Sequence, residues 1–99
     1  MFSSKKENGV VNIIWSDMDS TSIDYMHYHN DGIQSVLGVT FKSGQSYIYD
    51  KVKMADIINM LKAESVGSFF SKNIRMNYSY KNIGDADGNS PLQKIGITV

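Results

Sequence analysis

The chain has 99 residues, 41% of them hydrophobic and 20% charged, and its formal net charge is zero. This length suits one domain, 1–99, with a single core, and no apolar run approaches the ~20 residues that a membrane span requires. Cysteine is absent, which excludes disulfides and thiolate metal sites. We expect a soluble cytoplasmic protein. Its net charge of zero differs from the strongly basic balance of a dedicated nucleic-acid binder.

Charge is nevertheless uneven along the sequence. Residues 7–31 carry five acids and no lysine or arginine, whereas residues 42–81 carry seven bases against three acids. Such a cationic segment can lie against phosphates, or it can form part of an ordinary solvated surface.

The N-terminal third predicts two strands of an antiparallel sheet. Residues 1–9 are polar, and we expect them to fray. The apolar run over residues 10–15 predicts the first strand, a turn follows over residues 17–22, and residues 23–28 predict the second strand. Residues 30–32, Asn-Asp-Gly, then close a hairpin into a third strand.

The central hairpin decides which way two tyrosines face. Residues 36–42 alternate in the manner of a half-buried strand. A three-residue loop over residues 42–44, with Gly44 in the left-handed conformation, places Tyr47 and Tyr49 on the core face. A two-residue turn needs a serine at positive φ and places both rings on the outer face, as a stacking platform. We favour the three-residue loop.

Two helices are expected after this hairpin. Residues 54–63 have the periodicity of an amphipathic helix. Its predicted apolar stripe consists of Met54, Ile57, Ile58 and Leu61. Gly67 is typical of a helix stop, and Ser68 is a suitable N-cap for a short second helix over residues 69–76.

The C-terminal part predicts a turn and one more strand. Residues 84–90 are rich in turn formers, and residues 94–99 alternate as a strand does. The whole pattern predicts an α+β fold, a meander of about four or five antiparallel strands with both helices packed on one face.

Several spaced motifs in the middle of the chain form a specific combination. In chain order they are Ser20-Thr-Ser22-Ile23, Tyr28, Leu37-x-Val39-x-Phe41-x-x-Gly44-x-x-Tyr47-x-Tyr49-x-x-Val52, Leu61-x-Ala63-x-Ser65-x-Gly67-x-Phe69-Phe70, Asn73-Ile74-Arg75, Tyr78 and Tyr80. This combination resembles the KTSC domain, a small module found at the C-terminus of some lysyl-tRNA synthetases and as stand-alone bacterial and phage proteins. The resemblance implies a KTSC-like core over residues 20–81, with the strands predicted at 10–15 and 94–99 added to it.

The chain departs from the family pattern at three positions. Lys53 stands where the family usually has proline, Val66 where it has lysine, and His29 where it has aspartate. The lysine missing at position 66 weakens a phosphate-binding interpretation. RNA binding has been proposed for the family, but its function is not established, so the resemblance implies a domain and leaves the activity open.

One local pattern points to catalysis. Asp17, Asp19 and Thr21 follow an apolar strand in the Asp-x-Asp-x-Thr pattern of haloacid-dehalogenase-type phosphotransferases, in which one carboxylate is the nucleophile and the other the acid/base. That chemistry requires parallel βαβ repeats, for which the chain has no room. A serine-histidine triad is also absent. We therefore expect a protein that is not an enzyme and has no catalytic residues.

Two patterns point weakly to metals. His27 and His29 share one face of a strand, and Asp24 or Asp31 lies near enough in sequence for a zinc or nickel site, but two ligands do not make a site. Residues 85–89 resemble a calcium loop, but their spacing is wrong for one. We expect no metal and no cofactor.

The strongest binding feature is the junction before the second helix. There Ser65, Gly67 and Ser68 precede backbone amides that suit a phosphate. Cations and aromatic rings nearby in sequence complete a predicted site for single-stranded RNA or a phosphorylated nucleotide. These further residues are Lys42, Lys53, Lys72, Arg75, Tyr78, Tyr80 and Lys81. The structural alternative is that the glycine and serine only end and begin helices, while the tyrosines fill the core or support the C-terminal strand.

Two functions are consistent with these features. The first is a non-enzymatic module that binds RNA or the phosphate of a nucleotide, including a phage-type protein that sequesters a signalling nucleotide at an oligomer interface. The second is a protein-interaction or self-assembly module, for example a phage accessory or anti-defence protein. For this second function Phe69-Phe70 and six methionines offer apolar surface, and residues 94–99 offer a strand edge for a homo-oligomer.

Overall fold

Six consecutive strands form one antiparallel sheet in which each strand pairs with the next along the chain. The computed structural model describes residues 2–16, 20–86, 88 and 90–97. The expected antiparallel α+β fold is confirmed, with more strands than the sequence indicated. In chain order the strands are β1 (Phe2–Glu7), β2 (Val10–Ser16), β3 (Ile23–Asn30), β4 (Ser35–Phe41), β5 (Gln45–Asp50) and β6 (Tyr80–Asp85).

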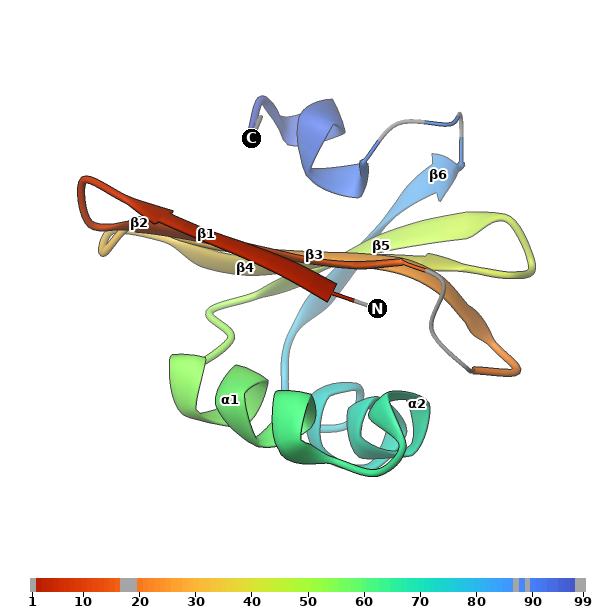
Figure 1. Ribbon diagram of the computed structural model, residues 1–99. Coiled ribbons are helices and arrows are strands. Elements are labelled where there is room, and N and C mark those ends of the chain that lie inside the picture. The colour runs from red at the N-terminus through yellow and green to blue at the C-terminus, as the bar shows by residue number, and fades with distance from the viewer. Residues whose placement is uncertain (1, 17–19, 87, 89, 98–99) are drawn as a thin grey trace.

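Helical segments cover the two faces of this sheet unequally (Figure 1). One face is covered by α1 (Met54–Lys62), the short α2 (Val66–Phe69) and the π-helical η1 (Phe70–Ile74), and we call it the helical face. The other is covered by one 3₁₀ turn, η2 (Pro91–Ile95), and we call it the η2 face. In the part of the chain that the structure describes, every helix is too short or too polar to cross a membrane.

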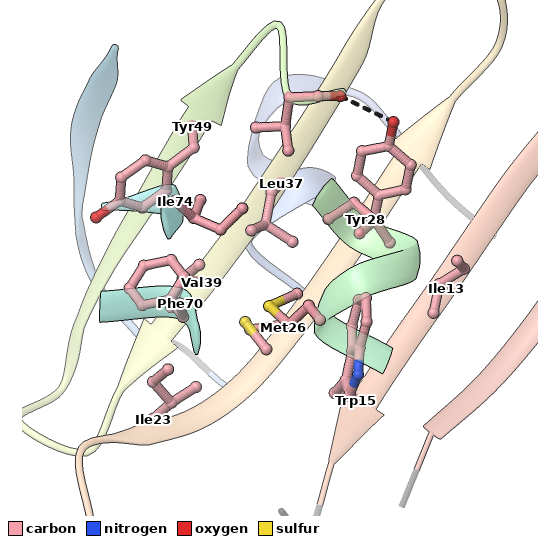
Figure 2. Close-up of a cluster of buried hydrophobic side chains, with 13 residues drawn as sticks. Ile13, Trp15, Ile23, Met26, Tyr28, Leu37, Val39, Tyr49, Phe70 and Ile74 are labelled. Atoms are coloured by element: carbon pink, nitrogen blue, oxygen red, sulfur yellow. Dashed lines mark hydrogen bonds between the residues drawn. The ribbon is translucent and has the colours of Figure 1, made fainter. Parts of the chain in front are cut away.

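The main core lies between the helical face and the helices (Figure 2). Successive strand residues point to opposite sides of a sheet, so alternate positions supply this core. Its buried members are Ile13, Trp15, Ile23, Met26, Tyr28, Leu37, Val39, Tyr49, Val52, Ile57, Met60, Phe70 and Ile74. The expected helix stripe is confirmed at Met54, Ile57 and Leu61, which pack in or against the core. Ile58, rotated by about 100° from Ile57, is instead 43% exposed, and Met60 is buried.

The central β4–β5 hairpin has the three-residue loop that the sequence favours. Leu37 pairs with Tyr49, and Val39 pairs with Tyr47. The φ angle of Gly44 is 98°, and its N–H donates a hydrogen bond of 2.9 Å across the loop. Both tyrosines therefore lie on the helical face, where Tyr49 is buried and Tyr47 is half-buried. The predicted register is confirmed.

The N-terminal segment forms a strand where fraying was expected. Over its whole length β1 pairs with β2, so the expectation for residues 1–9 is wrong in the described part of that segment. The connecting turn is Asn8-Gly9, with φ angles of 53° and 79°. Two positive φ angles define the type I′ turn that Asn-Gly favours in two-residue hairpins. The strand was not predicted because this exposed edge strand is polar and lacks an apolar alternation.

The C-terminal segment is helical where a strand was expected. Described residues within 94–99 belong to η2 and the turn after it, so that prediction is wrong, and the last strand of the sheet is β6. Pro91 suits the start of a helical turn, and Gly96, with φ of 88°, ends it. The turn packs on Gly38 of β4, where an added Cβ would lie 2.9 Å from the Cβ of Pro91.

Candidate functional site

A groove with a volume of about 570 Å³ opens beside the tip of the β4–β5 hairpin, facing η1. We call it the aromatic groove. The hairpin contributes Phe41, Lys42, Ser43, Gln45, Tyr47 and Tyr49 to its lining. The remaining lining residues are Thr21, Ser22, Ser71, Arg75, Met76 and Tyr80. Segments that are distant in sequence therefore build one site.

Five aromatic side chains form a closed circuit of ring contacts at this groove. The centroid distances around it are 5.6 Å for Tyr80–Tyr47, 5.4 Å for Tyr47–Phe41, 6.0 Å for Phe41–Phe70, 5.3 Å for Phe70–Tyr49 and 5.6 Å for Tyr49–Tyr80. These values lie in the usual range of about 4.5 to 7 Å for interacting rings. Figure 2 shows Tyr49 and Phe70 together at the end of the core away from Trp15.

The circuit is buried on its core side and open on its groove side. Tyr49 and Phe70 are 2% and 1% exposed, whereas Tyr80 and Met76 are 61% and 76% exposed. Both exposed side chains line the same groove, and apolar surface that gathers in this way, rather than singly, occurs at ligand and partner sites. Tyr80, with the half-buried Tyr47 behind it, is the accessible part of the circuit.

Two charged groups in the groove lining, Lys42 and Arg75, are cationic. Among the described residues that line it, Lys42 and Arg75 are charged, and no aspartate, glutamate or histidine is present. Lys42 Nζ donates a hydrogen bond of 2.6 Å to the Ser20 carbonyl oxygen, which holds the ammonium at the hairpin tip. Burial raises the pKa of Tyr49 to about 12, while the nearby charge of Arg75 acts in the opposite direction. The Tyr49 hydroxyl is therefore neutral at physiological pH.

The π-helical geometry of η1 separates core residues from groove residues. The Arg75 N–H donates to the Phe70 carbonyl oxygen at 2.9 Å, five residues earlier. Phe70 and Ile74 are buried in the core, whereas Ser71 and Arg75, the residues that follow each of them, line the aromatic groove. Short π-helical segments are rare and occur frequently at functional sites.

The predicted phosphate-binding junction is arranged differently from expectation. The second helix begins at Val66, and its N-cap is Ser65, whose Oγ accepts a hydrogen bond of 3.2 Å from the Ser68 N–H. Gly67 lies within the helix against Ser20, because an added Cβ would lie 2.9 Å from the Ser20 Oγ. The predictions of a Gly67 stop and a Ser68 cap are wrong, since the extended Ser65 already satisfies an early amide.

Three of the residues predicted for the site line the aromatic groove: Lys42, Arg75 and Tyr80. The others lie elsewhere. Lys72 is exposed on η1 but is outside the groove lining. Lys81 pairs with a β5 residue that is buried on the η2 face, so its side chain points to that face.

Tyr78 and Lys53 meet at the start of α1, away from the groove lining. The Tyr78 hydroxyl accepts a hydrogen bond of 3.2 Å from the Lys53 N–H and donates one to the Asp56 carboxylate. Burial, and then this hydrogen bond to Asp56, raises the pKa of Tyr78. Its hydroxyl therefore supports the start of α1, a role that neither the predicted ligand site nor its structural alternative included.

The apolar surface expected for the interaction alternative is largely internal. Phe70 is 1% exposed and belongs to the core, and Phe69 is half-buried. The strand edge expected over residues 94–99 is replaced by η2. Both observations remove support from that alternative.

The two histidines share a strand face, as the alternation predicts, and contact the same amide. Asn12 Oδ1 lies 2.8 Å from His27 Nε2 and 2.9 Å from His29 Nδ1, and His27 Nδ1 lies 2.9 Å from the Ser90 Oγ. Burial, and then the charge of His29, lowers the pKa of His27 to about 4. Within the described ranges no three metal-ligating side chains lie together.

The remaining sequence patterns fall partly outside the described residues. Asp17 and Asp19 of the Asp-x-Asp-x-Thr pattern lie outside them, as do residues 87 and 89 of the calcium-loop pattern. The strand before the aspartates, β2, is antiparallel to both of its neighbours, whereas the phosphotransferase chemistry requires a parallel sheet.

The fold and the groove together define a small antiparallel α+β domain with an aromatic and cationic groove at the end of its helical face. A family model described as the KTSC domain matches residues 19–78, which is more than half of the chain, and the chain therefore belongs to this family. No curated protein matched the chain. The matched residues include all of the groove lining except Tyr80.

Sequence reasoning missed most of the groove. Phe41, Tyr47 and Tyr49 were expected to be core residues, and Ser71 and Met76 were not singled out. The hairpin register places the tyrosines on the helical face, but it carries no information about where helical cover of that face ends. Tyr80 was the residue whose position in the sequence could have indicated the groove, because it lies two residues from Tyr78 in a segment that lacks an apolar pattern.

Proposed function

We propose that this protein is a non-enzymatic module that binds RNA or a phosphorylated nucleotide in the aromatic groove. The base stacks on the accessible ring of Tyr80, and Arg75 and Lys42 attract the phosphate. The observation that carries the proposal is the coincidence of an exposed aromatic ring with two cations in one groove of about 570 Å³. That volume falls within the usual range of small-molecule sites, about 300 to 1,000 Å³.

Each half of the site matches one half of a nucleotide. Stacking of a base on an aromatic side chain contributes about 1 to 3 kcal/mol and tolerates any base, because every base has a π-face. Arg75 presents a planar guanidinium that can donate two hydrogen bonds to one phosphate. Because no carboxylate lies among the described lining residues, nothing there repels an anion.

The lining also supports a role without catalysis. Its polar side chains within the described residues are hydroxyls, an amide, a lysine and an arginine. General acid–base work at neutral pH usually relies on histidine or a carboxylate, and neither is among the described lining residues. Those residues are therefore equipped to hold a ligand and include no group poised to abstract its protons.

A pair of charge reversals on one segment tests this proposal. Arg75→Glu should weaken binding of a fluorescent single-stranded RNA or nucleotide by at least about tenfold, because it reverses the charge beside the phosphate. Lys72→Glu makes the same change in charge three residues earlier, outside the groove lining, and should leave binding within about twofold. The measurement is fluorescence anisotropy at 50 mM salt, with unfolding checked for each variant. Equal effects of the two substitutions would contradict a site in this groove.

A further inference from the structure

The aromatic groove has room and charge for a short ligand. Its volume of about 570 Å³ is confined between the hairpin tip and η1. One aromatic ring, Tyr80, is largely exposed there, and the rings behind it are half-buried or buried. A groove that follows a longer strand instead offers a series of exposed rings along its length.

The five cations that the sequence predicted for the site are dispersed rather than aligned. Lys42 and Arg75 are at the groove, Lys53 is at the start of α1, and Lys81 points to the η2 face. Lys72 is exposed on η1 outside the lining. The cations therefore do not extend from the groove as a track for a phosphate backbone, and the chain has no net positive charge to support one.

An acidic group stands at one end of the groove. Gln45, a lining residue, pairs with Asp85 across β5 and β6, and its amide donates a hydrogen bond to the Asp85 carboxylate. Asn82 Nδ2 donates to Gln45 Oε1 at 3.2 Å, so both ends of the glutamine side chain are engaged. Lys94 Nζ donates a hydrogen bond of 2.5 Å to the Asp85 carbonyl oxygen, so an acid and a base lie together beyond Gln45 and give a continuing phosphate chain no net attraction there.

We propose that the groove takes a ligand of one or two nucleotides and does not track a longer single strand. This inference rests on the proposed function and specifies its ligand. One base stacks on Tyr80, and one or two phosphates lie near Arg75 and Lys42. Additional nucleotides extend into solvent beside Asp85 and contribute little.

A length series tests the proposal by isothermal titration calorimetry with adenosine 5′-monophosphate, the dinucleotide pApA and the ten-nucleotide strand A10. The affinity for a single binding position should not increase beyond the dinucleotide. A10 should bind no more than about tenfold more tightly than pApA, a statistical gain from overlapping binding positions. Its log–log salt dependence should have a slope of about −1.4, because single strands contribute about −0.7 for each contacted phosphate.

Matched variants accompany the series. Tyr80→Ala should weaken binding of pApA roughly tenfold, whereas Tyr80→Phe, which keeps the ring, should bind like the parent protein. The double substitution Lys72→Glu with Lys81→Glu reverses two charges outside the groove lining, and it should not change A10 binding by more than about twofold.

The possible outcomes separate the two proposals. A plateau at the dinucleotide, with A10 insensitive to the double substitution, supports both. If A10 binds a hundredfold or more tightly than pApA and the double substitution weakens it, the length limit is wrong while the proposed function stands. If none of the three ligands binds at millimolar concentration, or if Tyr80→Ala changes nothing, both proposals are overturned.

Discussion

The two faces of the sheet are built on different physical principles. On the helical face, apolar side chains of the strands pack against α1, α2 and η1, and an aromatic circuit that is buried only on its core side closes one end. On the η2 face, a short 3₁₀ turn rests on Gly38 over a small apolar cluster of Val36, Ile48, Leu92 and Ile97, and buried polar groups hydrogen-bond to each other. Asn12 Oδ1 lies within hydrogen-bond distance of both histidines there, and the hydroxyl oxygens of Thr40 and Ser46 lie 3.1 Å apart.

This difference explains where a ligand site can form. Burial of apolar surface is non-directional, so the helical face tolerates an edge at which helical cover ends and aromatic rings meet solvent. Buried polar groups require matched partners, so on the η2 face specific hydrogen bonds supplement the small apolar cluster. We therefore expect substitutions on the helical face to act through packing and those on the η2 face to act through fit and protonation.

The largest effect is expected from Phe70→Ala. Phe70 is 1% exposed and contacts Phe41 and Tyr49, so its removal should lower the free energy of unfolding by about 3 to 5 kcal/mol. Phe69→Ala is the matched control, because the Phe69 ring is only half-buried. This substitution should lower the free energy of unfolding by clearly less. Urea unfolding followed by the fluorescence of Trp15, the single tryptophan, measures both. Equal costs would contradict the description of the aromatic circuit.

The fit of η2 on its face is tested by Gly38→Ala. The new Cβ would lie 2.9 Å from the Pro91 Cβ and 3.0 Å from Leu92 Cδ2, and such overpacking lowers stability by about 1 to 3 kcal/mol. Hydrogen exchange followed by mass spectrometry should show faster exchange in η2 and unchanged exchange in α1. A substitution without effect would mean that η2 does not pack on this glycine.

Protonation of His27 should make the η2 face sensitive to acid. The pKa of His27 is lowered from 6.5 to about 4 in the folded protein, so the unfolded chain binds the proton first as the pH falls. The free energy of unfolding should therefore decrease between pH 6.5 and pH 4, by roughly 2 kcal/mol after an allowance for solvent screening. Unfolding measured across this range should show a flatter profile in His27→Gln. The same slope in both proteins would exclude His27 as its source.

The smallest effect separates the two candidate caps of α2. Ser65→Ala removes the oxygen that accepts from the Ser68 N–H and should lower the free energy of unfolding by about 1 kcal/mol. Ser68→Ala should cost only a few tenths of that, because its hydroxyl has no capping role in the structure. Thermal unfolding of the two variants in one buffer decides between them, and the reverse order would restore the original prediction.

The fold was predictable where local patterns agree with tertiary structure. The register of the β4–β5 hairpin follows from Gly44 and from strict alternation, and it is confirmed. Residues 94–99 misled because alternation over a short stretch also fits a helical turn, and Pro91 with Gly96 carried the better signal. β1 was missed although Asn8-Gly9 is a strong hairpin signal, because a solvent-exposed edge strand lacks an apolar face.

The candidate site was predictable only in its parts. Arg75, Lys42 and Tyr80 were each identified, but they were assigned to a helix terminus that Ser65 itself caps. The aromatic circuit joins β4, β5, β6 and η1, and no local pattern records that these elements converge. The π-helical turn that directs Arg75 into the groove also has no sequence signature comparable to a cap or a turn.

The central claim is that the aromatic groove, and no other face, holds the ligand. The most direct measurement is a titration of ¹⁵N-labelled protein with pApA, followed by amide chemical shifts in two-dimensional NMR spectra. We predict that the shifted amides cluster in the hairpin tip, around Ser71 and Arg75, and at Tyr80, while those of β1 and η2 stay unchanged. Shifts centred on η2 or on the start of α1, with the groove unaffected, would contradict the claim.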